Sequence, residues 1–245
     1  MNAGQRLLDV LETFDLEHRA LTVSEIAQRL GQPQSSVYRS VRTLKDAGYL
    51  AAGEDGVYRL QPKLLRLAAV VRADNDVLRC ARTPMLRLAH QTRQSSMLAV
   101  VSDRYAVCVD SVGSGRPIGV TVPPGKLFPL HAGASARVLL ANLPEIERRR
   151  RYAEYPPESF TDETTTDIDR LEAELAVIRD RGYDLTAEQF EPGIFACAVP
   201  VHDADGFVVA SLSVVGVVES VEVEGGVESL LPDLKAAAAA ISELL

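Results

Sequence analysis

The segment spanning residues 21–60 constrains the fold of this chain more than any other stretch of its sequence. Thr22 is followed three residues later by Glu25, which is the capping-box pattern that begins a helix. The apolar residues after Glu25 recur at helical spacing, and the Gly-Gln-Pro run at 31–33 then predicts the end of the helix and a turn. The segment therefore predicts a short capped helix followed at once by a change of direction.

A second helix and a β-hairpin follow this turn. The helix is predicted over residues 34–47, with Gly48 as its stop signal, and its apolar residues recur every three or four positions. Residues 49–52 and 57–60 have the pattern of two strands joined by the Gly-Glu-Asp-Gly turn at 53–56. Helix, tight turn, helix and hairpin in this order are typical of a winged helix-turn-helix, whose second helix enters the major groove of DNA.

The second helix also carries the side chains that contact with DNA requires. Short polar residues stand at its N-terminal end, where the backbone comes close to phosphate, and arginines follow one turn later. In an isolated surface helix such residues would simply be solvated, but the capped helix before it and the hairpin after it favour DNA binding. The predicted DNA-binding residues are Gln34, Ser35, Ser36, Tyr38, Arg39 and Arg42 on the helix and Arg59 on the hairpin.

Three sequence motifs in this segment resemble the N-terminal domain of the IclR family of bacterial transcription regulators. They are LTVSEIAQRLG, SSVYRSVRTLKDAGYL and YRL, in that order. The likeness continues in PLHAGASARVLLA at 129–141, which is similar to the family's PLHATAxGKALLA, and in the long stretch 178–216. The resemblance covers nearly the whole chain and implies a GAF-like, ligand-sensing C-terminal domain. The chain departs from the family at Ala136-Arg137, where Gly-Lys is most frequent.

The predicted fold class is α+β, with helices at both ends of an antiparallel meander. Residues 1–62 are predicted to form the winged helix-turn-helix domain, 63–76 a linker helix and 77–245 the GAF-like effector-binding domain. In the last domain, helices are predicted over 77–93, 131–142, 169–181 and 227–245, and strands over 96–101, 105–112, 118–122, 194–201 and 206–217. The resemblance implies that the linker contributes to dimerisation.

The charge and composition of the chain limit where the protein is expected to be located and what it is expected to bind. The formal net charge is −8, yet residues 1–72 carry ten Lys and Arg against eight Asp and Glu. The acidity therefore lies outside the predicted DNA-binding head, which suits a body that must not coat nucleic acid. The sequence contains neither an apolar run of about 20 residues nor a signal-peptide pattern, so a cytoplasmic location without a membrane partner is expected.

No motif predicts an enzyme, a cofactor or a metal site. Pro124-Gly125-Lys126 and the glycine-rich stretch 113–119 lack the residues of a phosphate loop. The three cysteines are far apart, the four histidines lack metal spacing, and neither Ser135 nor Ser213 lies in a nucleophile elbow. His131 is predicted to be a structural residue beside the ligand pocket.

The resemblance places the family's effector pocket at six positions spread over the second half of the chain. A pocket of small apolar residues, hydroxyl groups and helix N–H groups suits a small organic acid. At the positions of Ala196 and Val215 some members of the family have a polar or thiol side chain. The apolar side chains of this sequence at these positions favour a hydrophobic or aromatic acid. The predicted effector-binding residues are Ala134, Ser135, Thr186, Ala196, Ser213 and Val215.

These features favour a ligand-responsive transcription regulator that binds a palindromic DNA operator as a homodimer or a dimer of dimers. The alternative is a small-molecule-binding protein or an enzyme whose winged-helix domain serves protein contact. A catalytic constellation in the body would favour the alternative, and the sequence offers none.

Overall fold

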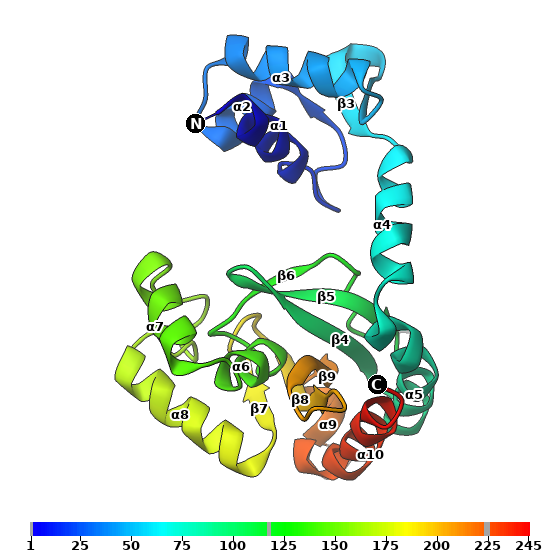
Figure 1. Cartoon of the computed structure of the whole chain (residues 1–245), viewed down its shortest axis with the longest axis vertical. Helices are drawn as coiled ribbons and strands as arrows, with labels where there is room; N and C mark the ends of the chain where they lie inside the picture. The colour runs from blue at the N-terminus through cyan, green and yellow to red at the C-terminus, as the bar shows by residue number, and fades with distance from the viewer. Residues whose placement is uncertain (1, 117–118, 223–225) are drawn as a thin grey trace. The chain divides into compact units, whose positions relative to one another are not determined.

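The computed structural model describes residues 2–116, 119–222 and 226–245. The chain divides into two compact units, Met1–Asp74 and Asn75–Leu245 (Figure 1). The N-terminal unit contains α1 (Ala3–Glu12), β1 (Leu21–Thr22), α2 (Val23–Leu30), α3 (Gln34–Asp46), β2 (Leu50–Ala52), the 3₁₀ turn η1 (Glu54–Gly56), β3 (Val57–Leu60) and α4 (Lys63–Ala73).

The N-terminal unit is a winged helix-turn-helix. The Thr22 hydroxyl accepts a hydrogen bond from the Glu25 N–H at 3.2 Å, and the Glu25 carboxylate accepts one from the Thr22 N–H at 2.7 Å. This capping box begins α2, and Gly31 ends it with a left-handed backbone, φ 60°. The strand β1 was not predicted; it pairs with β3, so the hairpin becomes a three-stranded sheet in the order β1-β3-β2.

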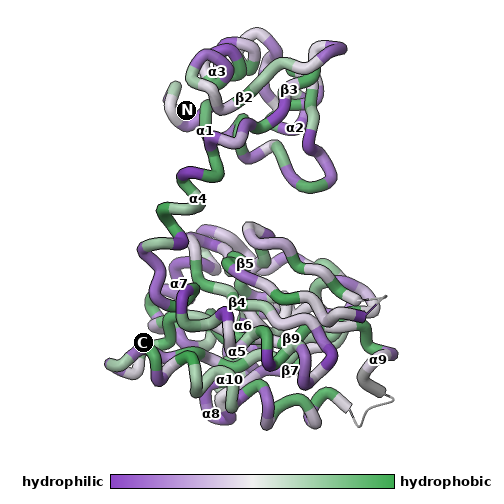
Figure 2. The backbone as a smooth tube through the Cα atoms, turned by 90° about the vertical axis from the view of Figure 1, so that its right-hand side faces the viewer, coloured by the Kyte–Doolittle hydropathy of each residue, from purple (hydrophilic) through white to green (hydrophobic). Residues whose placement is uncertain are grey.

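The buried core of this unit is small and continuous. It joins apolar side chains of α1, α2 and α3 to the first residues of β1 and β2 and to Phe14, which follows α1. Its residues are Val10, Phe14, Leu21, Ile26, Ala27, Val37, Val41, Leu44 and Leu50. The helix α4 stands apart from this core, because none of its residues, all of which the structure describes, is buried. Leu65 and Val71 are 69% and 61% exposed, and Figure 2 shows green, hydrophobic stretches along this helix.

The C-terminal unit is built on a six-stranded antiparallel sheet in the order β6-β5-β4-β9-β8-β7. Its strands are β4 (Ser95–Ser102), β5 (Tyr105–Val112), β6 (Leu127–Pro129), β7 (Asp184–Ala187), β8 (Ile194–His202) and β9 (Val208–Val217). Its helices are α5 (Asp76–Thr92), α6 (Ala134–Ala141), α7 (Glu145–Glu154), α8 (Ile168–Arg181), α9 (Glu219–Glu222) and α10 (Leu231–Ser242), with a 3₁₀ turn η2 (Val227–Leu230).

Helices cover both faces of this sheet (Figure 1). Side chains alternate along β9, so Leu212 and Val214 lie in the core beneath α5 and α10, whereas Val215 lies in the core beneath α6 and α8. Two apolar cores are the result, one on each side of the sheet. The domain is therefore α+β, as the sequence predicts.

One predicted strand, 118–122, is not formed. Ile118 lies outside the described residues, and residues 119–122 have no strand pairing. Side chains hold this segment instead, because the hydroxyls of Ser95 and Ser111 donate to the carbonyl oxygens of Val120 and Val122, each at 2.5 Å. The prolines that follow lack N–H groups and cannot continue a ladder, so β6 pairs with β5 further along the chain.

Two helix boundaries also differ from the prediction. The helix predicted from residue 131 begins at Ala134, because Gly133 has a positive φ of 83° that a helix excludes. The last helix begins at Leu231 after the 3₁₀ turn η2, with Pro232 in its first turn. The helix α7 was not predicted at all.

Candidate functional site

The exposed face of α3 gathers most of the predicted DNA-binding residues. Gln34, Ser35, Tyr38, Arg39 and Arg42 are all exposed and follow one stripe of the helix, while the apolar residues of the opposite stripe are buried. Among the described residues Arg39 forms no ion pair, and Arg42 has only a distant one, with Nε 3.9 Å from Asp46 Oδ2. Both guanidinium groups are therefore available to donate hydrogen bonds to another molecule at this face of α3.

The other two predicted residues lie elsewhere. Ser36 is half-buried, and its hydroxyl accepts a hydrogen bond from Arg6 Nη1 at 3.1 Å, so it ties α3 to α1. Arg59 is exposed on β3, opposite Ala51. The tip of the hairpin carries two exposed acids, Glu54 and Asp55, in a turn that Gly53 closes by donating its N–H to the Val57 carbonyl at 2.7 Å.

A cavity lies in the C-terminal unit at the N-terminal end of α6. The space open to the centre of a water molecule is about 60 Å³, and the whole void, including its mouth, is about 530 Å³. Its lining is mainly apolar and includes Ala134, Ser135, Thr186, Ala196 and Val215. The sheet register places Thr186, Ala196 and Val215 side by side on β7, β8 and β9, so one row across the sheet supplies part of its wall.

Ser213 does not line this cavity. It is 0% exposed, and its hydroxyl donates to the carbonyl oxygen of Met97 at 3.4 Å. It lies on the same face of β9 as Val215 but two residues earlier, where it pairs with Met97 of β4 and Ala198 of β8. The structure thus brings five of the six predicted positions together and places the sixth in the core.

The first turn of α6 presents hydrogen-bond donors to the cavity. The N–H groups of Gly133 and Ala134 donate to Gln189 Oε1 at 3.2 Å and to Thr186 Oγ1 at 3.1 Å. The N–H groups of Ser135 and Ala136 also lie in this turn, where a helix offers no internal acceptor. The buried Ser135 hydroxyl has no hydrogen-bond partner in the part of the chain that the structure describes. Such an end of a helix is suited to a carboxylate.

Several lining residues were not predicted; most of them lie in loops, and Phe128 lies on the short strand β6. Lys126 Nζ donates to Glu191 Oε1 at 2.5 Å, and its ammonium lies 5.4 Å and 5.8 Å from the ring centroids of Phe128 and Phe190. The two phenyl rings meet edge to face, with centroids 5.5 Å apart. Lys126 was considered only as part of a possible phosphate loop, and no periodicity identifies the others.

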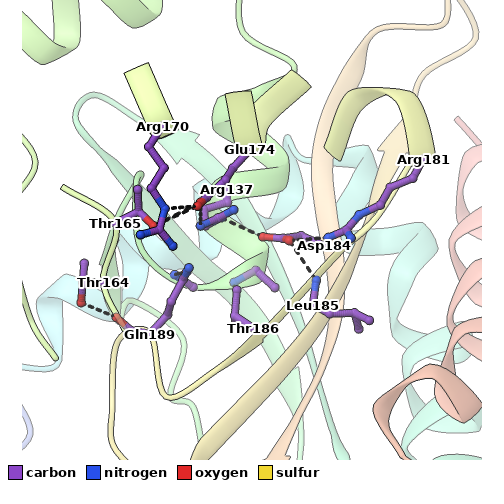
Figure 3. Close-up of polar contacts among 12 residues, drawn as sticks. Arg137, Thr164, Thr165, Arg170, Glu174, Arg181, Asp184, Leu185, Thr186 and Gln189 are labelled. Atoms are coloured by element: carbon purple, nitrogen blue, oxygen red, sulfur yellow. Dashed lines mark hydrogen bonds and ion pairs between the residues drawn. The ribbon is translucent and has the colours of Figure 1, made fainter. Parts of the chain in front are cut away.

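Arg137, which follows Ser135 on α6, points away from the cavity into a buried polar network (Figure 3). Its Nη1 donates to Glu174 Oε2 at 2.8 Å, and its Nε lies 2.9 Å from Asp184 Oδ2. The second contact lacks the geometry of a hydrogen bond, since neither atom has a hydrogen-bond partner among the described residues, so we treat it as an ion pair. Asp184 also accepts a hydrogen bond from Arg181 Nη2 at 2.7 Å. The network joins α6, α8 and β7 behind the cavity.

Burial shifts the pKa of three side chains of this unit that lie outside the lining of the cavity. Burial lowers the pKa of His131, whose Nε2 lies 2.8 Å from the Glu158 carbonyl oxygen. Burial raises the pKa of the Cys108 and Cys197 thiols to about 12, so neither is a nucleophile. Within the described ranges no group of three or more His, Cys, Asp or Glu side chains could hold a metal ion, and no helix is long and apolar enough to cross a membrane.

Two family models match the chain. The IclR helix-turn-helix domain matches residues 5–53, and the model described as bacterial transcriptional regulator IclR C-terminal matches residues 69–243. The HTH-type transcriptional regulator XynR of Escherichia coli is 29% identical over 211 residues, which cover 85% of this chain and 83% of the relative. KdgR of the same bacterium is 31% identical over 213 residues, which cover 84% and 80%.

A solved structure provides a further comparison. An IclR homolog from Microbacterium hydrocarbonoxydans, complexed with 4-hydroxybenzoate, superposes with a TM-score of 0.80 at 27% identity. The match covers 100% of this chain and 99% of the other. The structural likeness therefore extends over both units of this chain.

Proposed function

This chain belongs to the IclR family of bacterial transcription regulators, and from that premise we propose that it binds a palindromic operator and responds to a small organic acid. The relatives are named transcription regulators and not enzymes, so the chain is a DNA-binding regulator. The alternative of an enzyme with an accessory winged helix is thereby set aside.

The observation that carries the effector proposal is the unpartnered Ser135 hydroxyl, buried at the start of α6 within the part of the chain that the structure describes. A buried polar group without a partner is costly, and a ligand oxygen would satisfy it. We place a carboxylate against Ser135 and the first-turn N–H groups, and an apolar body against Ala196 and Val215. The 4-hydroxybenzoate bound to the Microbacterium homolog supports an aromatic acid.

Calorimetry on the purified protein tests this proposal. A panel of aliphatic and aromatic acids that includes 4-hydroxybenzoate should contain a binder, and that binder should alter the affinity for the operator, which can be selected from random DNA. A panel without any binder, or a binder without effect on operator affinity, would contradict the proposal.

The exposed apolar residues of α4 support a homodimer. One recognition helix reads one half-site, so a palindrome requires two heads related by a two-fold axis. Leu65, Val70 and Val71 are more than half exposed, and burying them against a second copy of α4 would remove apolar surface from water. Light scattering during size-exclusion chromatography should therefore give a mass of at least two chains, and a monomer would contradict this part of the proposal.

The substitution Arg39→Ala is expected to weaken binding to the selected operator by about 1–3 kcal/mol if Arg39 contacts a base. The reason is that Arg39 is exposed on α3 and forms no ion pair among the described residues. Gel-shift titration against specific and scrambled DNA measures the effect. Arg19→Ala is the matched control, because this exposed arginine lies outside α3 and the hairpin. A ratio of specific to scrambled affinity that does not change would exclude base reading by Arg39.

The double substitution Glu54→Lys, Asp55→Lys is expected to strengthen DNA binding with little regard to sequence and to steepen its dependence on salt. The two acids at the tip of the hairpin repel phosphate, which leaves Arg59 as the proposed DNA contact of the wing. Titrations over a series of salt concentrations compare the slopes of the two proteins. An unchanged slope would show that the tip does not approach the DNA backbone even when it is positively charged.

A further inference from the structure

A second pocket lies in the C-terminal unit, beside the effector cavity. We call it the outer pocket; it is lined by residues that include Arg104, Tyr105, His131, Arg151, Tyr155 and Phe160. The space open to the centre of a water molecule is about 460 Å³, compared with about 60 Å³ in the effector cavity. The turn between β4 and β5, the helix α7 and the loop that follows α7 supply its walls.

Arg104 has an unusual environment in this pocket. Its guanidinium carbon lies 4.9 Å from the ring centroid of Tyr105 and 4.7 Å from that of Tyr155. The two rings hold the guanidinium in place by cation–π contact, and no carboxylate of the described residues pairs with it. Glu154 and Glu158 also line the pocket, but neither forms an ion pair with Arg104 in the described structure, so this positioned cation is available to an external anion.

A second guanidinium group faces the same pocket. Arg151 on α7 donates from Nη1 to the carbonyl oxygen of Asp103, the residue that precedes Arg104. Its Nε is buried and lacks a hydrogen-bond partner among the described residues. Its nearest carboxylate is that of Glu147, at 3.6 Å from Nη2. The contact between α7 and the β4–β5 turn therefore brings two arginines to one pocket. Arg104 has no ion pair among the described residues, and Arg151 has only the longer one with Glu147.

Aromatic rings form another part of the wall, beside leucine, proline and glutamate side chains. Phe160 lies 5.8 Å from the ring of His131 and 5.1 Å from the ring of Phe190, measured between centroids. Phe190 lines both the outer pocket and the effector cavity. A flat apolar molecule has ring faces and edges to pack against here.

We propose that the outer pocket is a second binding site for a small aromatic carboxylate. The guanidinium groups of Arg104 and Arg151 hold the carboxylate, since planar guanidinium donors match its geometry. Tyr155 and Phe160 pack against the ring. This site differs from the effector cavity, where helix N–H groups and a hydroxyl supply the donors, and its existence does not depend on the proposed function.

Equilibrium dialysis of the full-length protein with radiolabelled benzoate tests the proposal. Wild type is expected to bind benzoate at two sites per chain, and Arg104→Gln to lose one site or weaken it at least about tenfold. Arg149→Gln is the matched control, because this α7 arginine pairs with Glu145, is exposed and does not line the pocket. Tyr155→Ala, which removes a wall and not a charge, provides a second variant if the first is poorly folded.

A variant of the effector cavity distinguishes benzoate binding at that cavity from binding at the outer pocket. Ala196→Leu is expected to fill the effector cavity, and Ala196 does not line the outer pocket. A single wild-type site that Arg104→Gln removes and Ala196→Leu retains would support the outer pocket and contradict the effector cavity. Unchanged number and affinity of sites in both Arg104→Gln and Tyr155→Ala would overturn the outer pocket.

Discussion

Replacing Arg137 by methionine is expected to lower the free energy of unfolding of the C-terminal unit by about 3–5 kcal/mol. Arg137 is 4% exposed, and it faces the carboxylates of Glu174 and Asp184. Methionine fills a similar space but leaves both carboxylates without this cation, and Asp184 is only 1% exposed. Asp184 retains Arg181 and Glu174 retains Arg170, but both of these arginines are more exposed than Arg137. The loss of the buried partner is costly because the Asp184 charge cannot regain its hydration.

Urea unfolding followed by circular dichroism measures the effect on the full chain. Arg170→Met is the matched control, because Arg170 pairs with the same Glu174 but its side chain is 72% exposed. The control should cost no more than about 1 kcal/mol, as exposed ion pairs do. Equal losses of unfolding free energy in the two variants would show that the burial of Arg137 does not determine how much this residue stabilises the fold.

The loss in Arg137→Met should also depend on pH. Burial raises the pKa of Asp184, and the guanidinium groups of Arg137 and Arg181 oppose that rise. Without Arg137 the pKa rises further above its value in the unfolded chain, so the folded variant retains a proton that the unfolded chain has released. Stability linked to a raised pKa is present at low pH and is lost as the pH rises through the folded-state value. The difference from wild type should therefore grow from acid to neutral pH.

Local signals in the sequence predicted the elements that have capped ends. The Thr22–Glu25 capping box, Gly31 and Gly182 mark the ends of helices by backbone geometry, which a sequence encodes directly. The helix α7 escaped prediction because its segment EIERRRRYAE has no apolar stripe. Long-range contacts stabilise it instead, since Arg148 donates from Nε and Nη2 to the Glu172 carboxylate of α8. No local pattern reports such a contact.

The effector cavity was predictable only as far as the family resemblance reaches. Ser135 and Arg137 are two positions apart, which turns their side chains by about 200° around α6. Ser135 therefore faces the cavity, as predicted, whereas Arg137 faces the polar network. Lys126 and Gln189 come from loops that tertiary packing brings to the cavity, and neither helical nor strand periodicity applies to them.

Replacing Ala196 by leucine is expected to weaken binding of the acid effector at least about a hundredfold. Ala196 is half-buried on β8, between Thr186 and Val215, where its side chain lines the cavity. An isobutyl group in place of a methyl group would occupy the space proposed for the apolar body of the ligand. Ser135→Ala, which removes only the unpartnered hydroxyl, should weaken binding by about tenfold at most.

Calorimetry with the effector found among the acids, together with titration of the operator, separates the possible outcomes. The N-terminal unit has its own buried core, so Ala196→Leu should bind the operator as wild type does and no longer respond to the acid. Ala204→Leu, in the exposed turn between β8 and β9, controls for the added apolar bulk. If Ala196→Leu keeps its ligand affinity, the acid binds elsewhere. If the folded variant loses operator binding as well, the two units are not separable in function, because a change confined to the effector cavity has then altered the DNA-binding head.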